Sequence, residues 1–242
     1  MKNPIYKPKG AAREYGELAL NIYGGCPHRC FYCFAPRVLH MDRETFHATC
    51  EPRPGIVEAV QEQLERIGMT GKTVHLCFTC DPFPTGYDCA PTLDIIRLLK
   101  RHGNHVQILT KGDGTACLDL LDEKDWYGIT LDGSESGTSA ATMRISTVIK
   151  ALERGVKTWV SFEPVVDPQA VIQYIDLVGG CFDRVKIGKL NYHKPPKPID
   201  WARFGREAEA LCQSMGLDYY IKSSLRVEME KGGATSEKER SV

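Results

Sequence analysis

Three cysteines stand close together near the N-terminus of this 242-residue chain, in the segment Asn21-Ile-Tyr-Gly-Gly-Cys26-Pro-His-Arg-Cys30-Phe-Tyr-Cys33. They fall within eight residues, whereas the other seven cysteines are scattered over the rest of the sequence. Thiolates are soft ligands that suit zinc and iron–sulfur clusters, and an ordinary [4Fe–4S] cluster takes four of them, one per iron. A loop that offers three can wrap such a cluster and leave the fourth iron open to an external ligand, much as catalytic zinc sites keep an open position.

Structural zinc is the alternative chemistry for this loop. Zinc would be held by Cys26, Cys30 and Cys33 together with either His28 or Cys50 as the fourth ligand. Structural zinc sites usually pair two short knuckles, and this chain has only one cluster of cysteines, so the spacing favours iron–sulfur binding. The zinc alternative predicts a nucleic-acid-binding module without catalysis.

Hydrophobic periodicity predicts the elements that must position this loop. Short β-rich runs alternate with helical patterns, which favours an α/β fold with a parallel sheet. Strands are predicted at Leu18–Tyr23, Thr73–Thr79, His105–Thr110, Gly128–Leu131, Thr158–Phe162, Arg184–Ile187 and Asp218–Ile221. Helices are predicted at Ile56–Ile67, Pro91–Arg101, Ala141–Arg154, Pro168–Val178 and Trp201–Met215, with stops at Gly68, Gly103, Gly155 and Gly216.

These units predict a partial (β/α)6 TIM-type barrel. A closed eight-unit barrel typically takes about 250 residues, and this chain also spends residues on the cysteine loop and two tails. We expect an N-terminal extension over residues 1–17, the barrel over 18–227 and a disordered tail over 228–242, because the tail is charged and nearly lacks large apolar residues. Sites in such barrels gather at the carboxyl ends of the strands, and the cysteine loop directly follows the first predicted strand.

The cysteine loop in this position resembles the signature of the radical S-adenosylmethionine (radical SAM) superfamily, with Tyr32 in the aromatic place before the last cysteine. The resemblance implies a [4Fe–4S] cluster on Cys26, Cys30 and Cys33, whose open iron binds S-adenosylmethionine. Reductive cleavage of S-adenosylmethionine then gives methionine and a 5'-deoxyadenosyl radical, which abstracts hydrogen from a substrate. It also implies a reducing electron donor such as flavodoxin or ferredoxin.

Further motifs are similar to those of the spore photoproduct lyase-like group of this superfamily. These are the Asn21 to Cys26 entry, Thr79-Cys-Asp81-Pro after the second strand, Thr110-Lys111 after the third, and Glu163-Pro164 after the fifth. The resemblance implies that Thr79 and Asp81 lie near the amino group of the cofactor and Lys111 near its carboxylate. It implies further cofactor contacts, with Asp132 or Ser134 near the ribose, Arg144 near the carboxylate, and Glu163 and Tyr32 elsewhere around it. An exposed helix arginine and a solvated loop acid are the alternatives for Arg144 and Glu163.

Two more cysteines, Cys77 and Cys80, flank the end of the second predicted strand. Residues three apart on a continuous strand point to opposite faces, so we expect neither a chelating pair nor a disulfide. Cys80 is the candidate catalytic residue, as a hydrogen-atom donor to a product radical. Phe78 occupies the position where the donor thiol of the spore lyase is sought, which places thymine-dimer repair in doubt.

Charge and composition give limited information about partners. Lys plus Arg equal Asp plus Glu at 31 each, so no global charge attracts nucleic acid or anionic lipid. Residues 184–206 carry seven Lys or Arg against one acid, with Tyr192, His193 and Trp201 interleaved, which is consistent either with a nucleic-acid contact or with a solvated basic connection. Together with the resemblance, this strip favours a nucleobase or nucleotide substrate.

The expected location is the cytoplasm. The first 16 residues lack the apolar region of a signal peptide, and ten cysteines in 242 residues are too few for a secreted disulfide scaffold. No apolar run approaches the roughly 20 residues of a membrane-spanning helix, so no membrane partner is expected.

Overall fold

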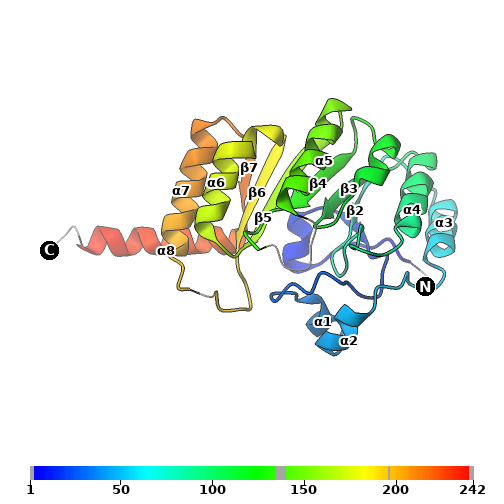
Figure 1. The fold of residues 1–242 in the computed structure, drawn as a ribbon, viewed down its shortest axis with the longest axis horizontal. Coiled ribbons are helices and arrows are strands. Elements are labelled where there is room, and N and C mark those ends of the chain that lie inside the picture. Colours follow the sequence, from blue (N-terminus) through cyan, green and yellow to red (C-terminus); the bar gives the residue numbers. More distant parts are fainter. Residues whose placement is uncertain (1–2, 135–139, 196, 240–242) are drawn as a thin grey trace. The chain divides into compact units, whose positions relative to one another are not determined.

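Strands and helices alternate along the chain in the computed structural model, which describes residues 3–134, 140–195 and 197–239 (Figure 1). The chain divides into two compact units, unit 1 with residues 1–129 and 135–157, and unit 2 with residues 130–134 and 158–242. Neighbouring strands pair in parallel within each unit. The predicted α/β class with parallel strands is therefore confirmed.

Unit 1 is built on four parallel strands that neighbour one another in chain order. Their inward residues are apolar at every second position, and Val74, Leu76, Val106 and Ile108 are completely buried. The strands are β1 (Leu18–Leu20), β2 (Thr73–Leu76), β3 (His105–Thr110) and β4 (Trp126–Thr130). The helices are η1 (Gly10–Glu14), α1 (Ala35–Val38), α2 (Arg43–Ala48), α3 (Ile56–Ile67), α4 (Ala90–Arg101), η2 (Thr115–Leu120) and α5 (Ala141–Glu153).

The N-terminal extension is part of unit 1. Tyr6 forms an antiparallel bridge with Ala19 of β1. The side-chain amide of Gln63 on α3 binds both backbone groups of Ile5, accepting from its N–H at 2.8 Å and donating to its carbonyl at 2.9 Å. A buried amide that replaces a strand partner in this way satisfies backbone groups that would otherwise be costly to bury. Residues 1–2 of the predicted extension lie outside the described residues.

The predicted helix stops are confirmed by the backbone. Gly68, Gly103, Gly155 and Gly216 have φ values of 58°, 69°, 73° and 66°. This left-handed conformation ends a helix, and it favours glycine because a Cβ is sterically unfavourable there.

Unit 2 contains three parallel strands, again paired in chain order. The strands are β5 (Lys157–Val165), β6 (Arg184–Lys189) and β7 (Tyr219–Ile221). The helices are α6 (Pro168–Val178), η3 (Gly179–Cys181), α7 (Trp201–Ser214) and α8 (Ser223–Glu239). Residues 130–134, which also belong to this unit, are hydrogen-bonded to β5. The N–H of Leu131 donates to the carbonyl of Ser161 at 3.1 Å.

Residues 228–239, which the sequence analysis assigns to a disordered tail, belong to α8 in the structure. Leu225 and Met229, four residues apart, are buried against α7. A Cβ at Gly205 of α7 would lie only 2.7 Å from the sulfur of Met229, so the glycine lets the two helices approach closely. The sequence shows charge there but does not show this contact surface. Residues 240–242 lie outside the described residues.

No helix among residues 3–134, 140–195 and 197–239 is long and apolar enough to cross a membrane.

Candidate active site

The cysteine loop runs from the end of β1 to α1 in unit 1. Cys26, Cys30 and Cys33 are partly exposed, and none of the ten cysteines, all of which the structure describes, forms a disulfide. Burial raises the pKa of the Cys26 thiol and of the Cys33 thiol. Because metals bind thiolates, loading this loop with metal must release protons.

Gly25 allows the loop to pass close to α2. A Cβ at this position would lie 2.0 Å from the carbonyl oxygen of Thr49 and 2.6 Å from that of Phe46. Both neighbours are backbone atoms, so they cannot turn aside as a flexible side chain would. Any side chain at position 25 must therefore move the loop or the end of α2.

We predict that Gly25→Ala lowers the free energy of unfolding of the metal-free protein by roughly 1–3 kcal/mol, as overpacking commonly does. Gly24→Ala is the matched control, because a Cβ at Gly24 would meet its nearest atom, the carbonyl oxygen of Glu51, at an ordinary 3.7 Å. Urea unfolding curves of the two variants make the comparison. Equal midpoints for both variants would contradict the predicted clash.

His28, between the first two cysteines, ties the loop to the segment after β2. The N–H of Thr85 donates to Nε2 of His28 at 3.2 Å, and because a backbone N–H can only donate, Nε2 carries no proton. Nδ1 then carries the proton and faces Oδ2 of Asp81 at 3.4 Å. Burial lowers the pKa of His28, which is consistent with a neutral imidazole.

Asp81 joins the ends of β2 and β3. Its Oδ1 accepts hydrogen bonds from the N–H of Phe83 at 2.8 Å and from Oγ1 of Thr110 at 2.5 Å. Its Oδ2 accepts from the N–H of Lys111 at 2.8 Å and faces His28. Both oxygens are thus engaged by the protein, and the side chain is buried. The geometry gives Asp81 a positioning role, and the expected contact with the cofactor amino group stays a prediction.

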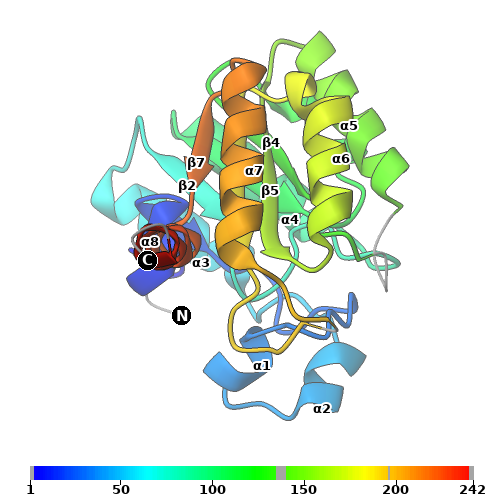
Figure 2. The same ribbon diagram turned by 90° about the vertical axis from the view of Figure 1, so that its left-hand side faces the viewer.

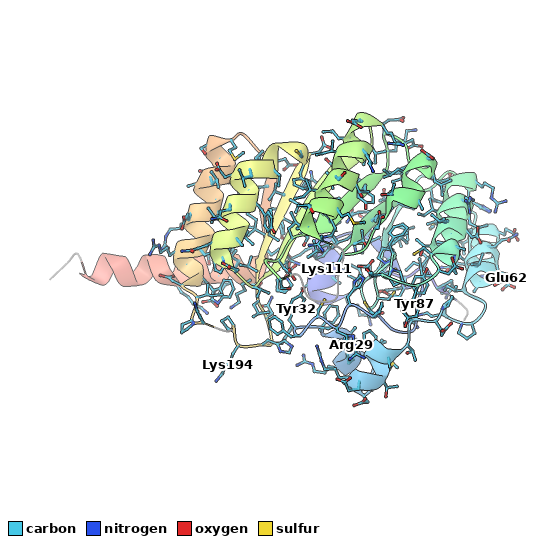
Figure 3. The ribbon with its side chains drawn as sticks, in the orientation of Figure 1. Arg29, Tyr32, Glu62, Tyr87, Lys111 and Lys194 are labelled. Atoms are coloured by element: carbon cyan, nitrogen blue, oxygen red, sulfur yellow. The ribbon has the colours of Figure 1, made fainter. Side chains whose placement is uncertain are left out.

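The structure brings three predicted site residues together, namely Tyr32, Lys111 and Arg144. The ammonium of Lys111 donates to the hydroxyl of Tyr32 and lies 5.0 Å from the centre of its ring (Figure 3). The guanidinium of Arg144 donates to the carbonyl of Lys111 at 3.5 Å. Arg144 is 1% exposed, so the alternative of a solvent-exposed helix arginine is wrong. Two buried cations therefore lie beside the cysteine loop.

Thr79 follows β2 and is buried, with its N–H bound to Oδ1 of Asn21 at 2.9 Å. Its hydroxyl oxygen is buried and makes no hydrogen bond within the described part of the chain. Buried hydroxyls normally have partners, so this oxygen is suited to a bound ligand. Three soft thiols, two buried cations and this hydroxyl together fit an iron–sulfur cluster and a zwitterionic cofactor.

Cys77 and Cys80 are free cysteines, as expected, but they lie close enough for each thiol to affect the pKa of the other. The strand β2 ends at Leu76, so the rule that residues three apart on a strand face opposite ways does not apply. Burial would raise the pKa of Cys80, but the neighbouring Cys77 thiol and the N–H of Tyr23, which donates to its sulfur at 3.4 Å, lower that pKa overall. Phe78 is used in packing, with its ring 4.4 Å from that of His75.

The remaining predicted site residues belong to unit 2. Asp132 is completely buried, and its Oδ1 accepts from both the N–H and the hydroxyl of Ser134, at 2.9 and 3.1 Å. Glu163 on β5 pairs with Lys222 after β7 at 2.8 Å, and the two side chains are only 17% and 4% exposed. Glu163 is therefore not a solvated loop acid. Gly188 on β6 makes room for this pair, because a Cβ there would lie 2.9 Å from the Glu163 carboxyl.

We predict that Lys222→Met costs roughly 3–5 kcal/mol of unfolding free energy, because it removes the ammonium that pairs with the largely buried Glu163 carboxylate. The double variant Glu163→Leu/Lys222→Met removes both charges and should recover most of that loss. Urea unfolding of the two variants and the wild type tests this. A double variant as unstable as the single one would show that the pair is not the source of the loss.

The basic strip over residues 184–206 is less continuous than the sequence suggests. Arg184 pairs with Asp218 and Lys189 pairs with Glu228, two acids from outside the segment. Lys186 is buried over the ring of Trp159. The remaining exposed basic residues are Lys194 and Lys197 in the loop after β6, beside Tyr192 and His193, and Arg203 and Arg206 on α7. Ion pairs between distant segments, which local counting misses, account for the difference.

The structure does not favour the zinc alternative. Both ring nitrogens of His28 have partners, and Cys50 is buried with its thiol donating to the carbonyl of Gly25 at 3.6 Å. Ligands of a tetrahedral zinc with Zn–S bonds of 2.3 Å lie about 3.8 Å apart. Among the described residues, three such ligand atoms come within 4.8 Å of one another only at a different place, His105, Asp122 and Asp125.

Sequence reasoning missed Arg43 and His47 in unit 1 and Lys222 in unit 2. Lys222 could have been found from its place directly after the last strand. Arg43 and His47 belong to α2, which was not predicted because a six-residue helix has too few turns for a periodic pattern. The available signal was Asp42 as an N-cap, whose Oδ1 accepts from the N–H of Thr45.

Comparison with protein families gives one match, to the family described as Radical SAM superfamily, over residues 20–174. The match covers well over half of the chain and includes the cysteine loop, Thr79, Asp81, Lys111 and Glu163. The chain belongs to the radical SAM superfamily, whose members are enzymes that use a [4Fe–4S] cluster and S-adenosylmethionine. A comparison with curated proteins gives no match.

Solved structures with the same fold include two kinds of radical SAM enzyme. A cysteine-to-alanine mutant of spore photoproduct lyase with dinucleoside spore photoproduct has a TM-score of 0.63 and 12% identity, covering 90% of this chain and 78% of the other. SuiB of Streptococcus suis bound to its precursor peptide SuiA has a TM-score of 0.63 and 15% identity, covering 88% of this chain. SuiB bound to S-adenosylmethionine has a TM-score of 0.60 and 13% identity, covering 85%.

The chain spans about half the length of the SuiB chains it matches. At these identities the likeness shows the fold alone. It supports the partial barrel predicted from the sequence.

Proposed function

We propose that this enzyme binds one [4Fe–4S] cluster through Cys26, Cys30 and Cys33 and cleaves S-adenosylmethionine reductively to start a reaction on a nucleobase or nucleotide. The observation that carries the proposal is the loop of three free thiols after β1, tied to Asp81 through His28 and to Lys111 through Tyr32. When bound, the cluster supplies an electron to the sulfonium, and the resulting 5'-deoxyadenosyl radical abstracts hydrogen from the substrate.

The chain's own residues bind and orient the cofactor. We assign the cofactor carboxylate to Lys111 and Arg144, because their buried cations prefer an anionic partner. We assign the cofactor amino group to Thr79, whose buried hydroxyl oxygen is able to accept a hydrogen bond. Oδ2 of Asp81 accepts a hydrogen bond from the N–H of Lys111 and so fixes the backbone position of that lysine.

In unit 2 we assign ribose contacts to Asp132 and Ser134, which already share a hydrogen bond, and a further cofactor contact to Glu163. Cys80 remains the candidate hydrogen-atom donor. Its sulfur accepts a hydrogen bond from the N–H of Tyr23 at 3.4 Å.

The nucleotide class is supported by two observations. The exposed loop after β6 combines two lysines with the 77%-exposed ring of Tyr192, and aromatic rings beside cations suit bases and phosphates. One structure of the same fold holds a dinucleoside. We further propose a reducing donor such as flavodoxin or ferredoxin and a cytoplasmic location, with which ten free cysteines agree.

The experiment that tests the chemistry is anaerobic reconstitution with iron and sulfide, followed by dithionite and S-adenosylmethionine. We expect about four irons per chain, as one cluster requires, together with 5'-deoxyadenosine and methionine. Zinc in place of iron, with no 5'-deoxyadenosine, would favour the zinc-stabilised binding module instead.

The substrate class is tested by binding of a fluorescent single-stranded oligonucleotide at several salt concentrations. Lys194→Ala/Lys197→Ala should weaken binding and reduce the salt slope by about 1.4, since each phosphate contact on a single strand contributes about 0.7. Lys124→Ala/Lys150→Ala is the control, because it removes two exposed lysines from unit 1. Equal effects of the two double variants would exclude a specific role for the loop after β6, and binding of a peptide instead would favour a peptide substrate.

A further inference from the structure

We infer that Arg43 and His47, on the short helix α2, are positioning residues that hold the main chain of all three cluster cysteines. This inference rests on the proposed function, because it concerns how the loop is prepared for the cluster. It assigns a role to a helix that contributes no cluster ligand.

Arg43 binds two of the three cysteines through one guanidinium group. Its Nη1 donates to the carbonyl of Cys33 at 3.3 Å, and its Nη2 donates to the carbonyl of Cys30. The guanidinium is planar and rigid, so the two acceptors are held in a fixed relation to each other. The N–H of Cys33 also donates to the carbonyl of Cys30 at 2.9 Å. The turn that carries these two thiols is therefore held both by its own backbone hydrogen bond and by the Arg43 side chain.

His47 binds the third cysteine. Its Nδ1 lies 2.8 Å from the carbonyl of Cys26, and because a carbonyl can only accept, Nδ1 carries the proton. The N–H of Cys26 donates to the carbonyl of Phe46, the residue before His47, at 3.3 Å. Both backbone groups of Cys26 are thus bound to the same turn of α2. His47 is only 4% exposed, so water does not compete for this contact.

The sequence of α2 places both side chains on the loop. Residues four apart lie one above the other on a helix, so Arg43 and His47 share a face. Asp42 caps the helix, and Gly25 lets the loop approach its carboxyl end. Figure 2 shows α2 beside α1, the helix that follows the last cysteine of the loop (Figure 2).

An exposed contact between the loop and α2 provides a matched control. Arg29, in the same loop, pairs with Glu44 on the same helix at 2.9 Å, but these side chains are 53% and 78% exposed. Exposed pairs contribute little to stability, and this one touches no cysteine carbonyl. Removing Arg29 therefore removes a loop-to-helix contact and an arginine without removing the support of a cluster cysteine.

The test is retention of iron by the reconstituted protein when an excess of iron chelator is added. Groups that orient metal ligands typically change metal affinity 10–100-fold when removed. We expect Arg43→Ala and His47→Ala to lose iron roughly 10–100-fold faster than the wild type, and Arg29→Ala to match the wild type. His47→Asn, whose amide can donate in place of Nδ1, should recover much of the loss. Arg43→Lys should not, because an ammonium lacks the planar fork.

The far-ultraviolet circular dichroism and urea midpoint of each metal-free variant separate loss of the loop's support from general unfolding. If Arg43→Ala and His47→Ala are folded yet keep iron as long as Arg29→Ala, the inference is wrong. If either variant is unfolded without metal, the rescue by His47→Asn and its absence in Arg43→Lys decide the matter, and rescue by neither or by both would contradict the inference. A wild-type protein that takes up no iron would refute the proposed function instead.

Discussion

Cys30→Ala is expected to abolish iron retention and S-adenosylmethionine cleavage together. Cys30 is one of only three thiols in the loop, so its loss leaves two ligands for a cluster that already has one open iron. We expect 5'-deoxyadenosine formation to fall by more than about 100-fold, beyond the effect of losing a group that merely orients a ligand. Iron content, the absorbance of the reconstituted protein and 5'-deoxyadenosine are measured on the same samples.

Cys181→Ala is the control for that variant, because Cys181 is also partly exposed but lies in η3 of unit 2. It should keep its iron and its activity. The metal-free Cys30→Ala protein should unfold at nearly the wild-type urea concentration, since substitutions at partly exposed positions usually change stability by less than about 0.5 kcal/mol. Cleavage that survives in Cys30→Ala would contradict the assigned cluster ligands.

Asp81→Ala is expected to have the largest effect on the fold of the site. The substitution deprives two buried N–H groups and the Thr110 hydroxyl of their acceptor. Each buried group left without a partner costs roughly 1–3 kcal/mol, so we expect a loss of about 3–5 kcal/mol in the unfolding free energy of the metal-free protein. Asp81→Asn retains one acceptor oxygen and should lose less. Urea unfolding at neutral pH measures both.

Asp113→Ala is the control for Asp81→Ala, because Asp113 is exposed and accepts hydrogen bonds only from Thr115 among the contacts described. We expect a change of about 1 kcal/mol or less, as for one ordinary hydrogen bond. If Asp81→Ala were as stable as the wild type but no longer bound S-adenosylmethionine, Asp81 would contact the cofactor, as the sequence motif implies.

The helices of this fold are predictable from the sequence where a long amphipathic pattern ends in a glycine. The predicted bounds of α3 and α6 are those observed, and α4, α5 and α7 differ by one residue at an end. Each of these helices buries one apolar stripe, which local periodicity reports directly. The short helices α1 and α2 lack such a stripe, because they pack on a loop and not on the sheet.

The ends of β1 and β2 show what local sequence does not contain. Both were predicted three residues too long, because apolar residues continue past the last ladder bonds. Asn21 explains the end of β2, since its Oδ1 accepts from the N–H groups of Phe78 and Thr79 in place of a strand partner. These contacts join residues 57 and 58 positions apart in the sequence, so no local pattern predicts them.

The same limit applies to the site. The spacing of three cysteines is enough to predict a metal-binding loop, because chelation depends on spacing within one loop. The partners of Asp81 come from the second and third strand ends and from His28, and the support for the loop comes from α2. Such positioning roles depend on which segments the fold brings together, so the sequence marked Asp81 as a site residue without showing that it joins these segments.

The most direct test of the central claim is electron paramagnetic resonance of the anaerobically reconstituted, dithionite-reduced protein, with and without S-adenosylmethionine. We predict the signal of one reduced [4Fe–4S] cluster, and a change in its g values when S-adenosylmethionine is added, because a cluster with three cysteine ligands has one iron open to the cofactor. Absence of an iron signal in a folded protein that holds zinc, or a cluster signal that S-adenosylmethionine leaves unchanged, would contradict the account.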